Sequence, residues 1–338
     1  MRSIRFWCGL ACVLAVCGEA AAQLTPERLY YGVGRRVLVR VDAPQDFTGE
    51  LTIRLHEIAD GSVVAEAAAA TGRADLAGLL AVLWEKPAER ARLAQLYADD
   101  QPLGPPVVVQ PMWTPVRALL IDPATGRPSE GPGAAPAFED DLDKGTGDRP
   151  ERVFTGLRLY VHKDVVFETS EGTMVFRLRP DQAPNTAFNL LHLVEGGFYT
   201  EVIVHRVVAT LPDGRPFVVQ FGDPSGEGSG GPGYHVDLER SGLAHDFGVL
   251  SMARGQDPNS NGSQVFVALS REGTSFLDGR YTSFAELVEG AAVLRAIAGV
   301  DVVEGGRPVA PPVITRALTR DAPGVSAVSV SASVGGDD

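Results

Sequence analysis

The sequence predicts a mainly β protein with two domains, a small β-sandwich-like domain followed by a larger β-rich domain that carries two helices. Short runs that alternate apolar and polar residues, the period of a half-buried strand, recur in both halves of the chain. A stretch rich in Pro, Gly and acidic residues separates the halves at residues 122–152. The length of 338 residues also suits about two domains.

The composition is that of a globular chain with a substantial core. It is 44% hydrophobic and 22% charged. The formal net charge is −13, which argues against a nucleic-acid partner, because phosphate binding requires clustered Lys and Arg. No basic stripe interleaved with aromatic residues is present in the sequence.

Residues 1–22 have the pattern of a secretory signal peptide. Arg2 and Arg5 precede an apolar run, Phe6–Val16, and Ala20–Ala22 provides a small-residue cleavage site, so the mature chain is expected to begin at Gln23. This predicts export to a periplasmic or extracellular location. The apolar run is too short for a membrane span.

Two alternatives for this segment stay open. It could be a hydrophobic N-terminal helix of a folded domain, or a lipoprotein signal processed at Cys17, although Val16 stands where a small residue is expected. The three cysteines, Cys8, Cys12 and Cys17, all lie inside the segment. Without it, the chain has no disulfide, thiol nucleophile or cysteine-based metal site.

The first domain is expected over residues 23–121. Strand patterns occupy residues 29–41 and 50–58, and the second is joined by an Asp-Gly turn to a strand at 62–65. Another hairpin pairs residues 92–97 with 106–110, whereas residues 76–84 fit either a short helix or a buried strand. His56 falls on the polar side of its strand and is predicted to lie on the surface.

Residues 122–152 are predicted to be a linker or long loop. The acidic run 139–145 has some features of a calcium loop. Gly145 and Arg152 stand where two of its ligands should be, so a solvated charge run is the better interpretation.

The second domain is expected over residues 153–320, with a disordered tail at 321–338. A hairpin spans residues 165–178, and a helix begins at Pro184 and ends at Gly196-Gly197. Phe188, Leu191 and Val194 recur at helical spacing and should face the core. The remaining elements are strands at 202–208, 217–220, 281–288 and 312–318 and a helix at 291–298.

Seven motifs follow one another along this domain. They are PNTA with Asn189 (184–189), HR (205–206), FVVQFGD (217–223), GSGG (228–231), LSMA (250–253), NGSQVF (261–266) and FLDG (276–279).

These motifs, in this order, resemble the cyclophilin-type peptidyl-prolyl isomerases over about Val165–Arg320. The resemblance implies an eight-stranded closed β-barrel capped by two helices. It also implies binding of X-Pro segments in unfolded or extended polypeptides and, as further candidates, cyclosporin-like ligands. Phe276 stands where many relatives carry Trp, a substitution of bacterial-type members.

The implied reaction needs no metal or cofactor, since no covalent bond breaks. Twisting the X-Pro amide removes its resonance, which creates a barrier of ~18–20 kcal/mol, and the uncatalysed exchange takes tens of seconds or more. In the twisted state the proline nitrogen gains a basic lone pair. A fixed cationic donor aimed at that nitrogen therefore binds the transition state more tightly than the ground state.

The resemblance assigns roles to individual residues. Arg206 matches the catalytic arginine, and Gln220 and Phe217 are assigned to the catalytic group with it. Gln220 and Gln264 match polar groups that hold the substrate backbone. Tyr281 stands where many relatives carry His, and both can offer a hydrogen bond. The residues that match the proline pocket are Phe217, Val218, Phe266 and Leu277. Ala253 and Arg254 match the rim that receives the peptide, and Phe276, at the position of the relatives' Trp, is a further substrate-binding residue.

The sequence departs from the family at three places. Residues 209–216 are inserted between Arg206 and Phe217, with Asp213-Gly214 as a plausible hairpin tip. Phe221 replaces a glycine, and Val218 replaces a larger Met. These changes bear on rate and substrate preference rather than on the fold.

Two other functions are possible for the second domain. The first is a serine hydrolase, since Ser229 lies in a setting like that of trypsin-like proteases, but no preceding Asp or partnered His accompanies it. The second is a cyclophilin-like module that binds peptides or docks partners while turning over poorly.

The first domain has no catalytic constellation. The hypothesis for it is that it presents clients or docks to an envelope structure.

Overall fold

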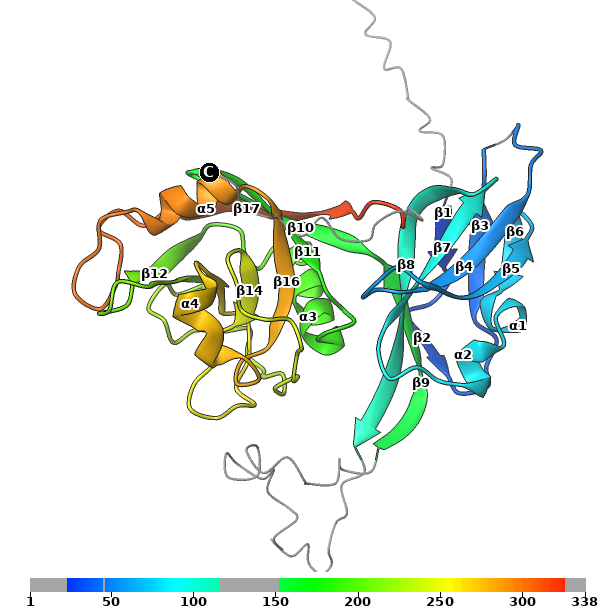
Figure 1. The fold of residues 1–338 in the computed structure, drawn as a ribbon, viewed down its shortest axis with the longest axis horizontal. Helices are drawn as coiled ribbons and strands as arrows, with labels where there is room; N and C mark the ends of the chain where they lie inside the picture. Colours follow the sequence, from blue (N-terminus) through cyan, green and yellow to red (C-terminus); the bar gives the residue numbers. More distant parts are fainter. Residues whose placement is uncertain (1–22, 45, 116–151, 326–338) are drawn as a thin grey trace, which may run out of the picture.

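The computed structural model describes residues 23–44, 46–115 and 152–325, which form two β-rich bodies side by side (Figure 1). The predicted signal peptide, the acidic run and nearly all of the predicted linker lie outside these ranges. Within them, no helix has the length and apolar character needed to cross a bilayer.

The first body contains two antiparallel sheets around one core. Their order is β1-β3-β6 in the smaller sheet and β2-β9-β8-β7-β4-β5 in the larger one. Side chains such as Leu24, Val39, Ile53 and Leu96 fill the core between them. The strands are β1 (Gln23–Pro26), β2 (Tyr30–Gly32), β3 (Leu38–Asp42), β4 (Leu51–Glu57), β5 (Val63–Ala69), β6 (Gly72–Asp75), β7 (Arg92–Ala98), β8 (Gln101–Pro115) and β9 (Arg152–Val161).

This body agrees with the predicted β-rich first domain but differs in local detail. The expected strand at 29–41 is two strands, β2 and β3, which belong to different sheets. The ambiguous run 76–84 forms two short helices, α1 (Leu76–Leu79) and α2 (Val82–Glu85).

Strand β9 falls inside the range expected for the second domain but pairs with the first. Its register partners are on β8, from Val107↔Val161 to Pro115↔Arg152. Leu157 and Leu159 are buried in the first core, and this burial explains the pairing. The barrel therefore begins at Lys163 rather than at residue 153.

The second body is a closed eight-stranded barrel, as predicted. The strand order is β10-β11-β16-β14-β15-β13-β12-β17. Helix α3 packs against β10, β16 and β17, and helix α5 packs against β11, β12 and β13. The elements are β10 (Lys163–Thr169), β11 (Gly172–Leu178), α3 (Pro184–Glu195), β12 (Val202–Thr210), β13 (Pro216–Phe221), β14 (Val249–Met252), β15 (Val265–Ala268), α4 (Arg271–Thr274), β16 (Ser283–Glu289), α5 (Ala291–Ala298) and β17 (Val313–Asp321), with a 3-10 turn at Ser275–Leu277.

Aromatic side chains fill the barrel interior. The Phe167 ring meets Phe176, Tyr199 and Phe221 edge to face, with centroids 5.2–5.9 Å apart. All four side chains are fully buried. The interior is thus a packed hydrophobic core.

Phe188 was predicted to face this core, and the structure corrects that expectation. Leu190, Leu191 and Val194 of α3 are buried in the barrel core. The Phe188 ring is half-buried and turns the other way, with its centroid 5.2 Å from that of Tyr160 and the Arg158 guanidinium 4.3 Å above it. Both partners belong to β9, so Phe188 joins the two bodies.

The chain after β17 also joins the bodies, which corrects the expectation of disorder for residues 321–325; the rest of the predicted tail, 326–338, lies outside the described ranges. The Ala322 N–H donates to the carbonyl of His162. The Val325 N–H donates to Gln95 Oε1 at 3.1 Å, and Tyr97 Oη donates to the Val325 carbonyl at 2.6 Å. Figure 1 shows this segment running from the barrel to the larger sheet.

His56 lies beneath this contact. This corrects the prediction that it lies on the surface. Only 2% of the residue is exposed, and its Nε2 lies 2.9 Å from Tyr97 Oη. A register shift between Leu55 and His56 interrupts the alternation of β4. The covering segment is more than two hundred residues away in sequence, so the pattern of β4 could not show it.

We expect Phe221→Ala to lower the free energy of unfolding by about 3–5 kcal/mol, because it removes a buried ring from the centre of the barrel. Urea denaturation followed by far-UV circular dichroism measures this change. Phe276→Ala is the matched control, since that ring is 50% exposed, and it should cost about 1 kcal/mol or less. Equal losses in the two variants would contradict the packing described.

Stability should fall as the pH drops through about 6.5. Burial lowers the pKa of His56, His162, His205 and His245. The unfolded chain, with histidine pKa values near 6.5, therefore binds more protons below that pH. Each histidine contributes a slope of up to about 1.4 kcal/mol per pH unit.

Urea titrations between pH 8 and pH 5 measure this slope. The free energy of unfolding should be nearly flat above pH 7.5 and should decline below pH 6.5. A constant value down to pH 5 would show that the four histidines are not held neutral by the fold.

Candidate active site

One row of side chains crosses the outer face of the barrel. On adjacent strands, Arg206 of β12 lies opposite Gln220 of β13, which lies opposite Phe266 of β15. Their chain neighbours Val207, Val219 and Val267 point into the core. Because side chains alternate along a strand, the row must face outward.

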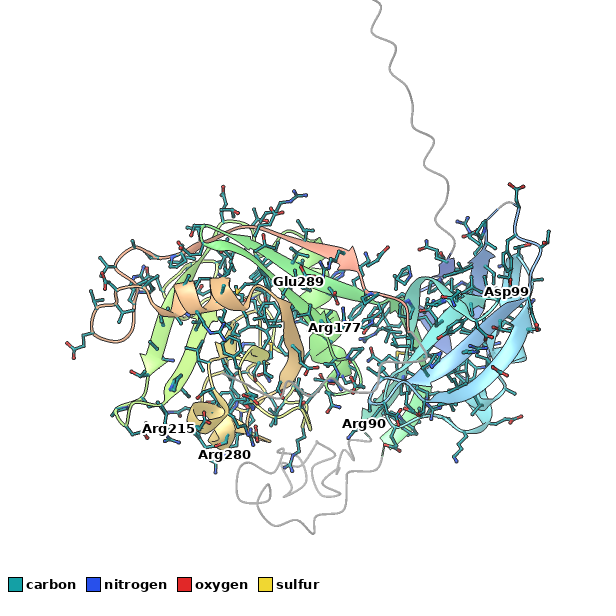
Figure 2. All side chains as sticks on the ribbon, turned by 45° about the horizontal axis from the view of Figure 1, so that its top comes forward. Arg90, Asp99, Arg177, Arg215, Arg280 and Glu289 are labelled. Atoms are coloured by element: carbon teal, nitrogen blue, oxygen red, sulfur yellow. The ribbon has the colours of Figure 1, made fainter. Side chains whose placement is uncertain are left out.

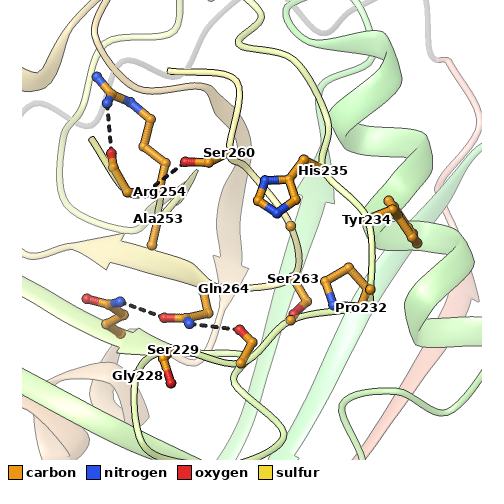
Figure 3. Close-up of a pocket in the computed structure, with 16 residues that line it drawn as sticks. Gly228, Ser229, Pro232, Tyr234, His235, Ala253, Arg254, Ser260, Ser263 and Gln264 are labelled. Atoms are coloured by element: carbon orange, nitrogen blue, oxygen red, sulfur yellow. Dashed lines mark hydrogen bonds between the residues drawn. The ribbon is translucent and has the colours of Figure 1, made fainter. Parts of the chain in front are cut away.

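Hydrogen bonds connect the polar members of this face. Arg206 Nη1 donates to Gln220 Oε1 at 3.3 Å, and Gln220 Nε2 donates to Gln264 Oε1 at 3.0 Å. Gln264 Nε2 donates in turn to the Gly230 carbonyl at 2.9 Å (Figure 3). Within the described ranges, no carboxylate lies within 4.0 Å of Arg206, which is exposed. The guanidinium is therefore held in place by Gln220, and no described carboxylate neutralises its charge.

An apolar cluster lies beside this chain of hydrogen bonds. Val218, Phe266 and Leu277 are buried at its floor. The Phe217 and Phe276 rings stack with centroids 5.9 Å apart, and Tyr281 meets Phe266 edge to face. The partly buried members packed on the floor are Val208, Phe217, Ala253 and Tyr281.

A buried polar set supports Phe266 from behind. The His245 ring stacks on Phe266 with centroids 5.7 Å apart. Its Nδ1 donates to Asp278 Oδ1 and its Nε2 accepts from Ser251 Oγ, both at 2.9 Å. Burial opposes ionisation of Asp278, but hydrogen bonds from Arg271 and His245 outweigh it and lower the pKa of the carboxyl to about 2.

This Ser–His–Asp arrangement cannot serve as a nucleophilic centre. Ser251 and His245 are fully buried, so no substrate reaches the hydroxyl. Their role is to hold Phe266 and the turn that carries Leu277. His245 was not among the residues predicted for the site. In the sequence it is marked only by its position near the strand that carries Ser251, which is a weak signal without the fold.

Two hollows flank the apolar cluster. The glycine-rich hollow, of about 510 Å³, lies between Gln220, Gln264 and Ala253 on one side and residues 228–235 on the other (Figure 3). The second, which we call the arginine cleft, has about 840 Å³ and extends past Leu277 and Tyr281. Arg254 lines both hollows.

The inserted residues 209–216 form the predicted hairpin tip. The Leu211 N–H donates to the Arg215 carbonyl at 2.8 Å and closes the turn. Arg215 Nη1 donates to the Glu272 carbonyl at 2.6 Å, which holds the tip against α4. None of these residues lines the glycine-rich hollow or the arginine cleft, so the insertion does not plug the site.

The structure brings all the predicted site residues onto this one face. Arg206, Gln220 and Gln264 form the polar chain, and Arg254 stands at the rim with its guanidinium 4.7 Å above the Tyr281 ring. The others belong to the apolar cluster or stack on it, namely Phe217, Val218, Ala253, Phe266, Phe276, Leu277 and Tyr281. The described part of the chain contains no group of three or more His, Cys, Asp or Glu placed to hold a metal ion.

Comparison with known proteins identifies the barrel. The family model "Cyclophilin type peptidyl-prolyl cis-trans isomerase/CLD" matches residues 164–319. "Peptidyl-prolyl cis-trans isomerase-like 1" of Aspergillus fumigatus is 39% identical over 151 residues, which cover 43% of this chain and 88% of the relative. "Peptidyl-prolyl cis-trans isomerase ppi1" of Schizosaccharomyces pombe is 36% identical over 164 residues, 46% of this chain and 97% of the relative.

Among solved structures, a Cryptosporidium parvum cyclophilin type peptidyl-prolyl cis-trans isomerase, crystallised in the presence of the dipeptide Ala-Pro, is 31% identical. The match covers 46% of this chain and 98% of that chain, with a TM-score of 0.43. The sequence relatives are matched over most of their length at more than 30% identity. The chain therefore belongs to the cyclophilin-type peptidyl-prolyl cis-trans isomerase family.

Proposed function

We propose that this chain catalyses the cis–trans isomerisation of X-Pro bonds, with Arg206 stabilising the twisted amide. The observation that carries the proposal is the position of one guanidinium free of any described carboxylate, held by Gln220 beside the apolar cluster. The names of the sequence relatives, peptidyl-prolyl isomerases at 36–39% identity, support it.

Each part of the face has a task in this reaction. The apolar cluster takes the proline ring, since burial of the ring's apolar surface favours binding. The amides of Gln220 and Gln264 hold the substrate backbone, and their mutual hydrogen bond keeps them oriented. This grip fixes one side of the X-Pro bond while the other side rotates.

Arg206 supplies the hydrogen bond that stabilises the transition state. Its guanidinium has five N–H donors, and one of them is engaged by Gln220 at 3.3 Å. A second donor is thus available for the proline nitrogen once resonance is lost. Because the planar amide offers that nitrogen no lone pair, the bond forms only as the amide twists.

We also propose that the protein is exported and acts on exported polypeptides that contain X-Pro bonds. The pattern of residues 1–22 motivates this location, either periplasmic or extracellular, and the bacterial origin suggested by Phe276 is part of the same proposal. The relatives named above are fungal proteins or proteins of another eukaryote, so they do not bear on the location. Cyclosporin-like ligands are candidates for the same apolar cluster.

Arg206→Ala should lower kcat/KM for a short Ala-Pro peptide by tenfold or more, because the transition state loses its charged donor and about 1.4 kcal/mol corresponds to one decade. Proline-isomer exchange measured by NMR or by a protease-coupled assay gives the rate. Arg316→Ala is the matched control, since Arg316 is an exposed arginine on β17, opposite Glu168. It should keep the wild-type rate.

The same assay separates the isomerase from a peptide-binding module. If the wild type binds the peptide but does not accelerate exchange, and Arg206→Ala binds equally well, the isomerase proposal fails and the module is favoured. The inserted hairpin is held away from both hollows, so its position does not favour a peptide-binding module over an isomerase.

Expression of the full chain in a bacterial host, with the intact mass and the N-terminal peptide of the purified product measured by mass spectrometry, tests the export proposal. The expected first residue is Gln23, because Ala20–Ala22 provides the cleavage site. A chain that starts at Cys17 with a lipid mass would indicate lipoprotein processing. An intact product starting at Met1 in the soluble cytoplasmic fraction would contradict export.

A further inference from the structure

The arginine cleft adjoins the apolar cluster and shares two of its residues, Leu277 and Tyr281. A peptide whose proline occupied the cluster would extend into the cleft within a few residues, since an extended chain rises about 3.3 Å per residue. The other residues that line the cleft include Arg240, Arg254, Asp278 and Arg280.

The charge of this lining is strongly positive. It contains three arginines, Arg240, Arg254 and Arg280, and one acid, Asp278. That acid is already engaged, because Arg271 Nη2 lies 2.6 Å from its Oδ2 and His245 occupies its Oδ1. Among the described residues, no carboxylate lies within 4.0 Å of the three arginines. The positive charge is notable on a chain whose net charge is −13.

The three arginines differ in their free hydrogen-bonding capacity. Arg254 is a fixed charge, since its Nε and Nη2 donate to the Arg280 carbonyl at 3.2 and 3.1 Å and its Nη1 donates to two further carbonyls. Arg240 and Arg280 are exposed, and neither side chain donates to another described residue. Figure 2 labels Arg280 on the barrel.

We propose that the arginine cleft binds the carboxylate of an aspartate or glutamate near the proline, so that the protein prefers acidic X-Pro substrates. Arg240 and Arg280 provide planar forks that match a carboxylate, and Arg254 adds a fixed positive charge. This inference rests on the proposed function. A side-chain carboxylate suits the cleft better than a polyanion does, because the chain's −13 charge repels an extended anion.

Peptides with an Ala-Pro core and Glu, Gln or Lys at each flanking position in turn test this preference. At one position or more, kcat/KM with Glu should exceed that with Gln by about threefold or more, and Lys should be worst. The preference should shrink as the salt concentration rises from about 20 to 300 mM, because Arg240 and Arg280 are exposed to solvent.

The double variant Arg240→Gln, Arg280→Gln should bring the Glu-to-Gln ratio of kcat/KM close to one. The control Arg316→Gln removes an exposed arginine outside the cleft and should keep the ratio. A ratio within twofold of one at every position in the wild type, or a ratio unchanged in the double variant, would overturn the proposal.

The Gln peptides distinguish failure of the proposed acidic preference from failure of the proposed isomerase function. If the Gln peptides are turned over without any preference for Glu, the isomerase proposal stands and the acidic preference is wrong. If no peptide is turned over, the isomerase proposal is wrong. Dissociation constants of the same peptides, measured by calorimetry, then decide the preference: equal values for Glu and Gln overturn it, and tighter binding of Glu supports it.

Discussion

The alternation of side chains along β12, β13 and β15 is the constraint on which the rest of this structure depends. The inward residues Val207, Val219 and Val267 complete a packed barrel core. The outward residues Arg206, Gln220 and Phe266 are thereby placed side by side. A shift of one residue in register would exchange the two sets, burying a guanidinium and exposing valines. Stability and site geometry are thus set by the same pairing.

Buried groups support the outer face from below, and hydrogen-bonded loops support it from the sides. His245 and Asp278 support the floor through Phe266 and the turn that carries Leu277. Arg254 ties the 254–256 loop to the carbonyl of Arg280. Such an arrangement suits the proposed isomerisation, which would need a positioned donor and no bond-breaking group.

Among the described residues, contacts at three places join the two bodies, and each involves residues from distant parts of the sequence. Strand β9 lies in the first sheet and carries Arg158 and Tyr160, which meet Phe188 of the barrel. Gln110 of β8 donates to Asn185 at the start of α3 at 3.3 Å. The segment after β17 returns to Gln95 and Tyr97. These contacts give the first domain a fixed place beside the barrel helix α3, on elements that do not line the candidate active site.

The sequence by itself determined the β class, the hairpins and the two longer helices, because strand alternation and turn residues are local signals. The residues of the candidate site came from the resemblance of its motifs to the cyclophilin family. Only the tertiary structure decided the sheet to which β9 belongs, the direction of Phe188 and the burial of His56. Each of these depends on a partner far away in the chain: Val107–Pro115 for β9, Tyr160 for Phe188, and Val325, through Tyr97, for His56. Local periodicity reports which face of an element is apolar, but not which distant surface covers it.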